Sequence, residues 1–93
     1  MNFLIAIHKD PDSDYGVTVP DLPGCFSAGS TFAEALVMAK EAIELHLDAL
    51  LDDGRELPTP TLDVEDLRKD PIYADAIWAL VTVEIDWRAP AVA

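Results

Sequence analysis

The stretch from Tyr15 to Thr31, YGVTVPDLPGCFSAGST, constrains the fold more than any other part of the chain. It begins with the apolar/polar alternation that is typical of a half-buried strand. Pro20 and Pro23 each have a fixed φ and no backbone N–H, so ladder pairing stops between them. Pro23-Gly24 favours a type II turn, because glycine adopts the positive φ that this turn needs. We therefore predict a strand, a rigid turn and then the start of a helix.

The remaining elements follow from alternation and turn composition. Strands are predicted at residues 2–9, 15–20 and 26–28, with a turn at 10–14 that makes the first two a hairpin. The most apolar strand is predicted at residues 76–86.

Helix signals are concentrated in the middle of the chain. Thr31 and Glu34 have the spacing of a capping box, and the helical period continues to Asp53, with Gly54 as the stop. A stiff Pro-x-Pro linker at 58–60 and a short, weaker helix at 63–69 follow. The predicted fold class is α+β: an antiparallel sheet of three N-terminal strands plus one C-terminal strand, with the long helix on one face. We expect residues 1–86 to form one domain and residues 87–93 to form a tail.

The long helix is predicted to have two apolar regions. The stripe expected to face the core contains Phe32, Leu36, Ala39, Ile43, Leu47 and Leu50. The opposite stripe is acidic and contains Glu34, Glu41, Glu44, Asp48 and Asp52. Met38 and Leu45 fall close to the acidic stripe, so they either contact a second molecule or lie under the linker at 55–62.

The last strand also has apolar side chains on both faces. The set expected to face the helix is Ile77, Ala79, Val81, Val83 and Ile85. Trp78 and Leu80 then face the other way, as do Leu4 and Ala6, on a face that would be wet in a monomer. We interpret this outer face as a surface for an oligomer or another partner, and one sheet continuing into that of a second copy would pair an exposed edge.

The net charge limits the classes of molecule that the chain can bind. The chain has 18 acidic and 6 basic residues, for a net charge of −12. Such a surface repels polyphosphate, so we expect no nucleic-acid binding by this chain alone. It either attracts a basic protein or simply keeps the protein in solution. Without an apolar run of membrane-spanning length or a leader-like start, we expect no membrane association and a cytoplasmic location.

Chemical motifs are sparse. Cys25 is the one cysteine, which excludes an internal disulfide, and we expect it to be a buried apolar residue. The spacing of the histidines is not that of a zinc site, and we expect no catalytic residue, metal or cofactor. A metal-dependent nuclease using Asp10, Asp12, Asp14 and Asp21 is a further hypothesis, but three of these acids lie on a turn. We therefore predict that the protein is not an enzyme.

The chain resembles the N-terminal domain of the HicB family, the antitoxins of bacterial HicA–HicB toxin–antitoxin pairs. The residues that carry the resemblance are PDLPGC at 20–25, Gly29-Ser30-Thr31, Glu34-Ala35, Ala39, Glu41-Ala42-Ile43, His46, Leu50, Asp53-Gly54 and Pro58-x-Pro60. It implies a degenerate RNase H-like fold without a dependable catalytic set. It also implies a small basic HicA toxin as partner, an mRNA-cleaving protein with a double-stranded-RNA-binding-like fold and an essential histidine.

The resemblance and the surface analysis together predict an antitoxin that masks the toxin's RNA-binding and catalytic surface. The candidate partner-binding residues are Asp21, Pro23, Met38, Glu41, Leu45, Asp48, Trp78 and Leu80. We expect a homodimer or homotetramer. The alternative is a stand-alone oligomeric domain that binds a ligand or another protein. HicB proteins usually continue into a DNA-binding domain, whereas this sequence ends at Ala93, so we expect no such domain within residues 1–93; either the sequence is part of a longer protein or this member lacks the domain.

Overall fold

A computed structural model of the chain describes residues 1–84 and confirms the predicted α+β fold. The elements in chain order are β1 (Asn2–His8), β2 (Tyr15–Thr18), β3 (Phe26–Gly29), α1 (Phe32–Asp52), α2 (Val64–Leu67), a 3-10 turn η1 (Pro71–Tyr73) and β4 (Ile77–Thr82). The predicted tail at 87–93 and the end of the predicted last strand, Ile85 included, lie outside the described residues.

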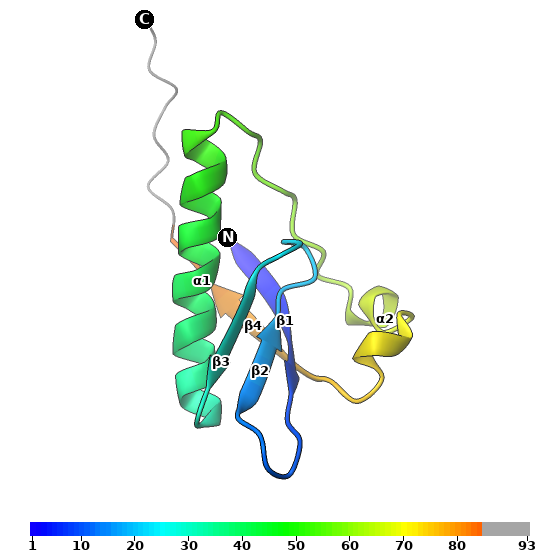
Figure 1. The fold of residues 1–93 in the computed structure, drawn as a ribbon. Coiled ribbons are helices and arrows are strands. Elements are labelled where there is room, and N and C mark those ends of the chain that lie inside the picture. The colour runs from blue at the N-terminus through cyan, green and yellow to red at the C-terminus, as the bar shows by residue number, and fades with distance from the viewer. Residues whose placement is uncertain (85–93) are drawn as a thin grey trace, which may run out of the picture.

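The four strands form one antiparallel sheet in the order β3-β2-β1-β4, which places the first strand in the interior. Figure 1 shows α1 on one side of this sheet and α2 on the other. We call these two sides the inner face and the outer face. Along β1, side chains alternate between them, so Phe3, Ile5 and Ile7 point to α1 whereas Leu4 and Ala6 point away.

The core lies between α1 and the inner face. The buried residues of this cluster are Phe3, Ile5, Ile7, Val17, Val19, Leu22, Cys25, Ala35, Ala39, Ile43, Leu47, Val81 and Val83. Two details of the predicted core stripe were wrong. Phe32 is 38% exposed and packs edge-on against Tyr15, with ring centroids 6.0 Å apart. Ala35, which was not predicted, is fully buried, because the contact ridge of α1 has a spacing of four residues and starts there.

A glycine lets α1 approach the sheet closely. Gly29 ends β3, and a Cβ atom at this position would come within 2.7 Å of the Ala35 Cα and would also collide with the Ala35 nitrogen. Backbone atoms cannot move away as a flexible side chain can. The small pair Gly29 and Ala35 therefore allows the backbone contact that sets the distance between β3 and α1.

The ends of α1 match the sequence signals. Thr31 Oγ1 accepts a hydrogen bond from the Glu34 N–H at 3.0 Å, while the Glu34 carboxylate accepts from the N–H and the hydroxyl of Ser30, each at 3.2 Å. At the other end, Gly54 has a φ of 71°. The Arg55 N–H donates to the Leu50 carbonyl at 2.9 Å, which is the hydrogen bond of a Schellman motif that spans six residues.

The outer face is covered by the connecting segment, which we define as residues 55–76. Tyr73 stacks on His8, with ring centroids 6.4 Å apart, and meets the ring of Trp78 at 5.4 Å. His8 and Trp78 flank Ala6 on this face, and Ala6 is fully buried. The prediction of a wet outer face was therefore wrong for Ala6, because it did not anticipate this cover, and it was also wrong for Leu4, which is 7% exposed.

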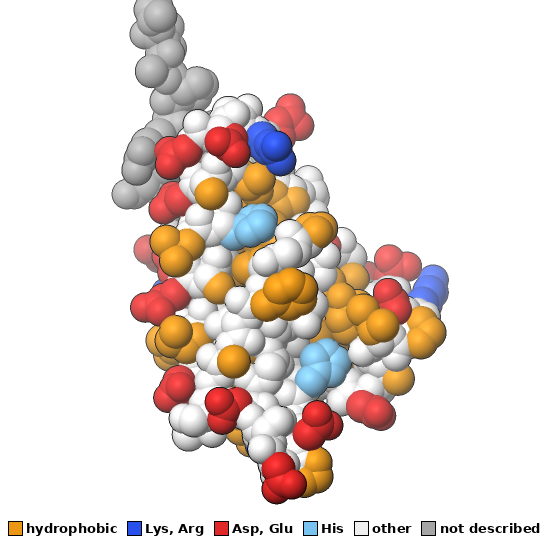
Figure 2. Space-filling view, viewed as in Figure 1, with side chains coloured by type: hydrophobic (Ala, Val, Ile, Leu, Met, Phe, Trp, Pro, Cys, Tyr) orange, Lys and Arg blue, Asp and Glu red, His pale blue; other side chains and the backbone are white. Residues whose placement is uncertain are grey.

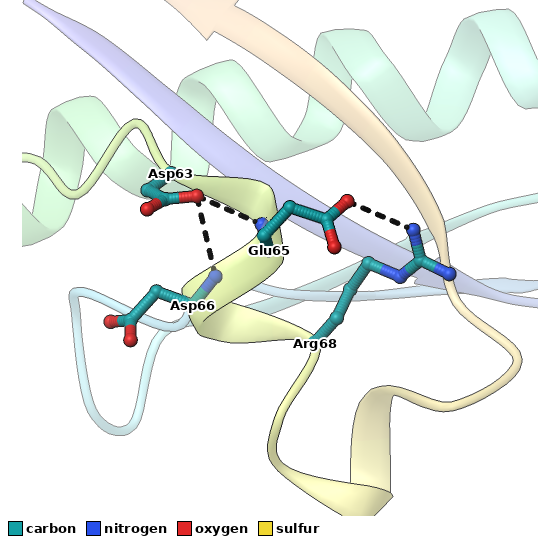
Figure 3. Close-up of polar contacts among 4 residues, drawn as sticks. All are labelled: Asp63, Glu65, Asp66 and Arg68. Atoms are coloured by element: carbon teal, nitrogen blue, oxygen red, sulfur yellow. Dashed lines mark hydrogen bonds and ion pairs between the residues drawn. The ribbon is translucent and has the colours of Figure 1, made fainter.

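Local contacts hold much of the connecting segment. Asp63 caps α2, with its Oδ1 accepting from the Glu65 N–H at 3.0 Å and the Asp66 N–H at 3.3 Å (Figure 3). Arg68 pairs with Glu65 at 3.3 Å on the same short helix. α2 has no buried residue, so it contributes little to the core.

Candidate partner-binding surfaces

The outward side of α1 combines acids with exposed apolar side chains. Leu45 is 71% exposed and Met38 is 39% exposed, so the alternative that the linker covers them was wrong. Val37, which the sequence analysis did not single out, is 59% exposed and lies among the acids. We call this surface the α1 face, and its members are Val37, Met38, Glu41, Glu44, Leu45 and Asp48. Figure 2 shows acidic side chains with hydrophobic ones between them along the α1 side.

Within residues 1–84, no ion pair balances the charges of Glu41 and Asp48 on the α1 face. The ion pairs of Arg68 with Glu65 and of Lys69 with Asp66 lie on or next to α2. Glu41 and Asp48 are exposed and take part in neither. A basic protein can therefore pair with these acids without first breaking an internal salt bridge, and apolar contacts lie beside them.

The PDLPGC turn is built from two consecutive β-turns. The Leu22 N–H donates to the Val19 carbonyl at 3.0 Å, and the Cys25 N–H donates to the Leu22 carbonyl at 2.9 Å. Gly24 has a φ of 84°, as the second turn requires. Leu22 and Cys25 point into the core, and burial raises the pKa of the Cys25 thiol. The turn thus anchors two core residues and presents Pro23 at its exposed tip.

Asp21 has an internal partner. Its Oδ2 accepts a hydrogen bond from the Thr61 N–H at 2.6 Å, which ties the turn to the connecting segment. Burial, together with the charges of Asp70 and Asp21, raises the pKa of Tyr73 in the same segment. The acid at this position therefore helps to hold the connecting segment against the sheet.

The outer face keeps some exposed apolar groups at its two edges. Leu80 on β4 is 55% exposed, and Phe26 on β3, which the sequence analysis did not single out, is 66% exposed. Trp78 is half-buried, and its Nε1 is buried without a hydrogen-bond acceptor among the described residues. The exposure of Phe26 follows from its position on an edge strand, which the residue pattern of such a short strand does not reveal.

The predicted partner-binding residues thus lie in three places. Met38, Glu41, Leu45 and Asp48 come together on the α1 face. Trp78 and Leu80 lie on the outer face, on the far side of the sheet, while Asp21 and Pro23 lie in the turn at the end of β2. A single flat contact cannot include both the α1 face and the outer face.

Residues 1–84 contain neither a candidate metal centre nor a candidate membrane-spanning helix. The described residues contain no group of three or more His, Cys, Asp or Glu side chains arranged to hold a metal ion. The four aspartates of the nuclease hypothesis are therefore not gathered into such a group. No helix in this part of the chain has the length and hydropathy needed to cross a membrane.

Comparison with protein families gives one match over nearly the whole chain. Residues 3–91 match the model of the HicB-like antitoxin of bacterial toxin–antitoxin systems. An uncharacterized 14.9 kDa protein of Haemophilus phage HP1, from the rep-hol intergenic region, is 45% identical over 91% of this chain. The chain spans 62% of the length of that phage protein.

Solved structures agree with this match. The antitoxin HicB of Burkholderia pseudomallei is 43% identical and superposes with a TM-score of 0.83 over 96% of this chain and 70% of its own. A structure described as a HicA3 and HicB3 toxin–antitoxin complex contains a chain that is 34% identical, with a TM-score of 0.74. The match covers 90% of this chain and 99% of that one.

Proposed function

The chain belongs to the HicB-like antitoxin family of bacterial toxin–antitoxin systems, and from this membership we propose that it is an antitoxin. Its partner is a small, basic, mRNA-cleaving toxin of the HicA type. The antitoxin masks the RNA-binding and catalytic surface of the toxin and performs no chemistry itself. Because the toxin acts on mRNA, the pair works in the cytoplasm.

The α1 face is the observation that supports this proposal. A protein that binds RNA presents a basic surface, and the acids of the α1 face complement that charge. Charge alone steers the encounter and adds little affinity once salt screens it. Exposed Met38 and Leu45 supply the apolar area that the complex buries, so the affinity is reduced but not abolished as salt rises. Pro23, at the tip of its turn, provides a second, smaller contact.

Co-purification with the neighbouring gene product tests the proposal. The chain is expressed with the adjacent gene, the neighbour alone carries a tag, and light scattering gives the mass of the eluted complex. We expect a stable complex and restored growth of cells that express the neighbour. A chain that elutes alone and does not restore growth would contradict the antitoxin role and favour a stand-alone binding domain.

A pair of matched substitutions locates the contact. Leu45→Lys on the α1 face and Leu80→Lys on the outer face both introduce a charge at an exposed leucine. Calorimetry at low and high salt should show at least a tenfold loss of affinity for Leu45→Lys, about 1.4 kcal/mol, and little change for Leu80→Lys. The reverse pattern would keep the antitoxin role and move the toxin to the opposite side of the sheet.

We also propose that the protein associates with itself as a dimer or tetramer. The edge of β4 that faces away from β1 provides the surface for that contact.

A further inference from the structure

Within residues 1–84, the edge of β4 that faces away from β1 pairs with no other strand. The Val83 N–H donates to the Met1 carbonyl and the Met1 nitrogen donates to the Val83 carbonyl, each at 2.8 Å, so these two residues form a hydrogen-bonded pair. Such pairs alternate along an antiparallel ladder. Trp78, Leu80 and Thr82 therefore direct their N–H and C=O groups away from β1.

The side chains of β4 make this edge unusual. Leu80 on the outer face is 55% exposed, and Ile77 on the inner face is 48% exposed. Between Asp75 and Glu84 the sequence AIWALVTV contains no charged residue and no proline. Natural edge strands are normally protected by charges, proline, a bulge or shortness. β4 has six residues and none of these protections, and a strand that is apolar on both faces is typical of a sheet interior.

The other edge strand is different. β3 has four residues, two of which are Ser27 and Gly29, and its end is packed against α1. A short strand with serine and glycine is a poor template for pairing. Of the two edges, β4 therefore has the longer and more favourable surface for an added strand.

We propose that β4 pairs antiparallel with β4 of a second copy across a two-fold axis, so that the two sheets become one. An antiparallel strand edge is complementary to itself, which fits an isologous dimer. The charge pattern favours the same occupant. A chain with a net charge of −12 repels its copy over most of its surface, whereas β4 is neutral. A basic toxin, in contrast, finds no acid within this strand to pair with. Pairing of the two β4 strands does not depend on the antitoxin role.

The alternation of backbone groups also limits the register, and the exposed apolar side chains of β4 favour one of the registers that it allows. Only the even-numbered residues of β4 direct hydrogen-bonding groups outward, so they must face one another. Centring the axis on Leu80 places the two Leu80 residues opposite each other and Trp78 opposite Thr82 of the second copy. On the inner face, Ile77 then lies opposite Val83 of the second copy. Both exposed apolar side chains of β4 are covered by this arrangement.

Disulfide trapping tests the register. Cα atoms of a hydrogen-bonded antiparallel pair are about 5.5 Å apart, which lies within the range that a disulfide spans. Under mild oxidation Leu80→Cys should give a covalent dimer in high yield. Leu45→Cys is the matched control, because Leu45 on α1 is 71% exposed and thus even more accessible than Leu80, and it should stay monomeric on a denaturing gel. The native Cys25 is 4% exposed and does not compete. Equal cross-linking of both variants, or none of Leu80→Cys, would overturn the proposal.

The mass of the protein in solution provides the second test. It distinguishes self-association through β4 from binding of the toxin. Light scattering should show a dimer for the native chain and for Leu45→Lys, and a monomer for Leu80→Lys, with the dissociation constant raised at least tenfold. Circular dichroism checks that each variant is folded.

Added salt should tighten the dimer, because it screens repulsion between two acidic copies, and it should weaken the toxin complex. A native monomer, or a Leu80→Lys chain that still dimerises, would overturn the proposal. Loss of toxin binding in Leu80→Lys from a native monomer would assign the edge to the toxin instead.

Discussion

The two faces of the sheet are covered in different ways. On the inner face, α1 lies so close that Gly29 and Ala35 meet backbone to backbone, and the ridge Ala35, Ala39, Ile43 and Leu47 is fully buried. On the outer face, the connecting segment lies across β1 through the ring of Tyr73 and is tied to the turn by one Asp21 hydrogen bond. The inner face holds the fold together, whereas the outer face is covered by a segment with few long-range contacts.

This difference predicts where the molecule opens first. Segments with few buried apolar contacts open locally at a lower free energy than the core. The connecting segment should therefore exchange its amide hydrogens faster than β1 or α1. Substitutions on the inner face should therefore lower the free energy of unfolding more than substitutions on the outer face. Their effects should also extend over more of the chain.

The largest expected effect is on the inner face. Gly29→Ala places a methyl group against the Ala35 backbone, which cannot move without shifting α1. Overpacking of this kind costs about 3 kcal/mol, a large part of the roughly 5–15 kcal/mol that stabilises a typical domain. Urea unfolding followed by circular dichroism measures the loss.

Gly16→Ala on β2 is the matched control. A Cβ atom there meets the His8 carbonyl oxygen at 3.8 Å, an ordinary contact, so the change in unfolding free energy should stay within about 0.5 kcal/mol. If the two alanine variants were equally stable, the close approach of α1 would not be what holds the inner face.

The next effect tests the attachment of the outer face. Asp21→Ala removes the acceptor of the Thr61 N–H and should cost about 1 kcal/mol. Asp21→Asn keeps an acceptor oxygen and should lose less. Hydrogen exchange should accelerate in the connecting segment of Asp21→Ala while α1 is unchanged. Faster exchange across the whole chain would show that the two faces are coupled.

The smallest effect is a loss of stability at alkaline pH. Burial raises the pKa of Cys25 from 9.0 and of Tyr73 from 10.0, so the folded chain holds both protons more tightly than the unfolded chain. The contribution of these two groups to the free energy of unfolding is therefore complete below pH 9, and it is lost as the pH rises through the ordinary pKa of each group towards its raised pKa. Cys25→Ala should remove the part of the decline that begins near pH 9, and Tyr73→Phe the part that begins near pH 10. A decline unchanged in both variants would assign it to other groups.

Local signals predicted both ends of α1 correctly, whereas the strand predicted at 15–20 ends at Thr18 and the helix predicted at 63–69 covers only Val64–Leu67. Thr31, Glu34 and Gly54 act through hydrogen bonds and dihedral angles that involve neighbouring residues only, and the structure confirms all three. The Pro23-Gly24 turn is confirmed for the same reason.

Contacts between distant segments were predicted less well. The alternation along β1 predicted correctly that Ala6 points to the outer face. It could not show that Tyr73 packs against His8 and Trp78 on that face. The helical period likewise placed Phe32 in the core, because the period alone does not show which side chains of α1 lie nearest to the sheet. The close approach at Gly29 moves the contact ridge to Ala35, and that shift depends on two segments meeting. On the surface, composition and period alone identified Met38 and Leu45, while Val37 was overlooked because it lies within the acidic stripe.

The strand order has a consequence for synthesis. β1 is made first but lies in the sheet interior, and one of its two neighbours, β4, is made after every other described element. Pairing residues that are so far apart in the chain is slow, because a long loop must close before the contacts form. While β2, β3 and α1 can assemble around one side of β1, its other edge stays open on the growing chain. A chain released before β4 is made would thus expose the apolar edge of β1, which makes it a substrate for proteases and chaperones.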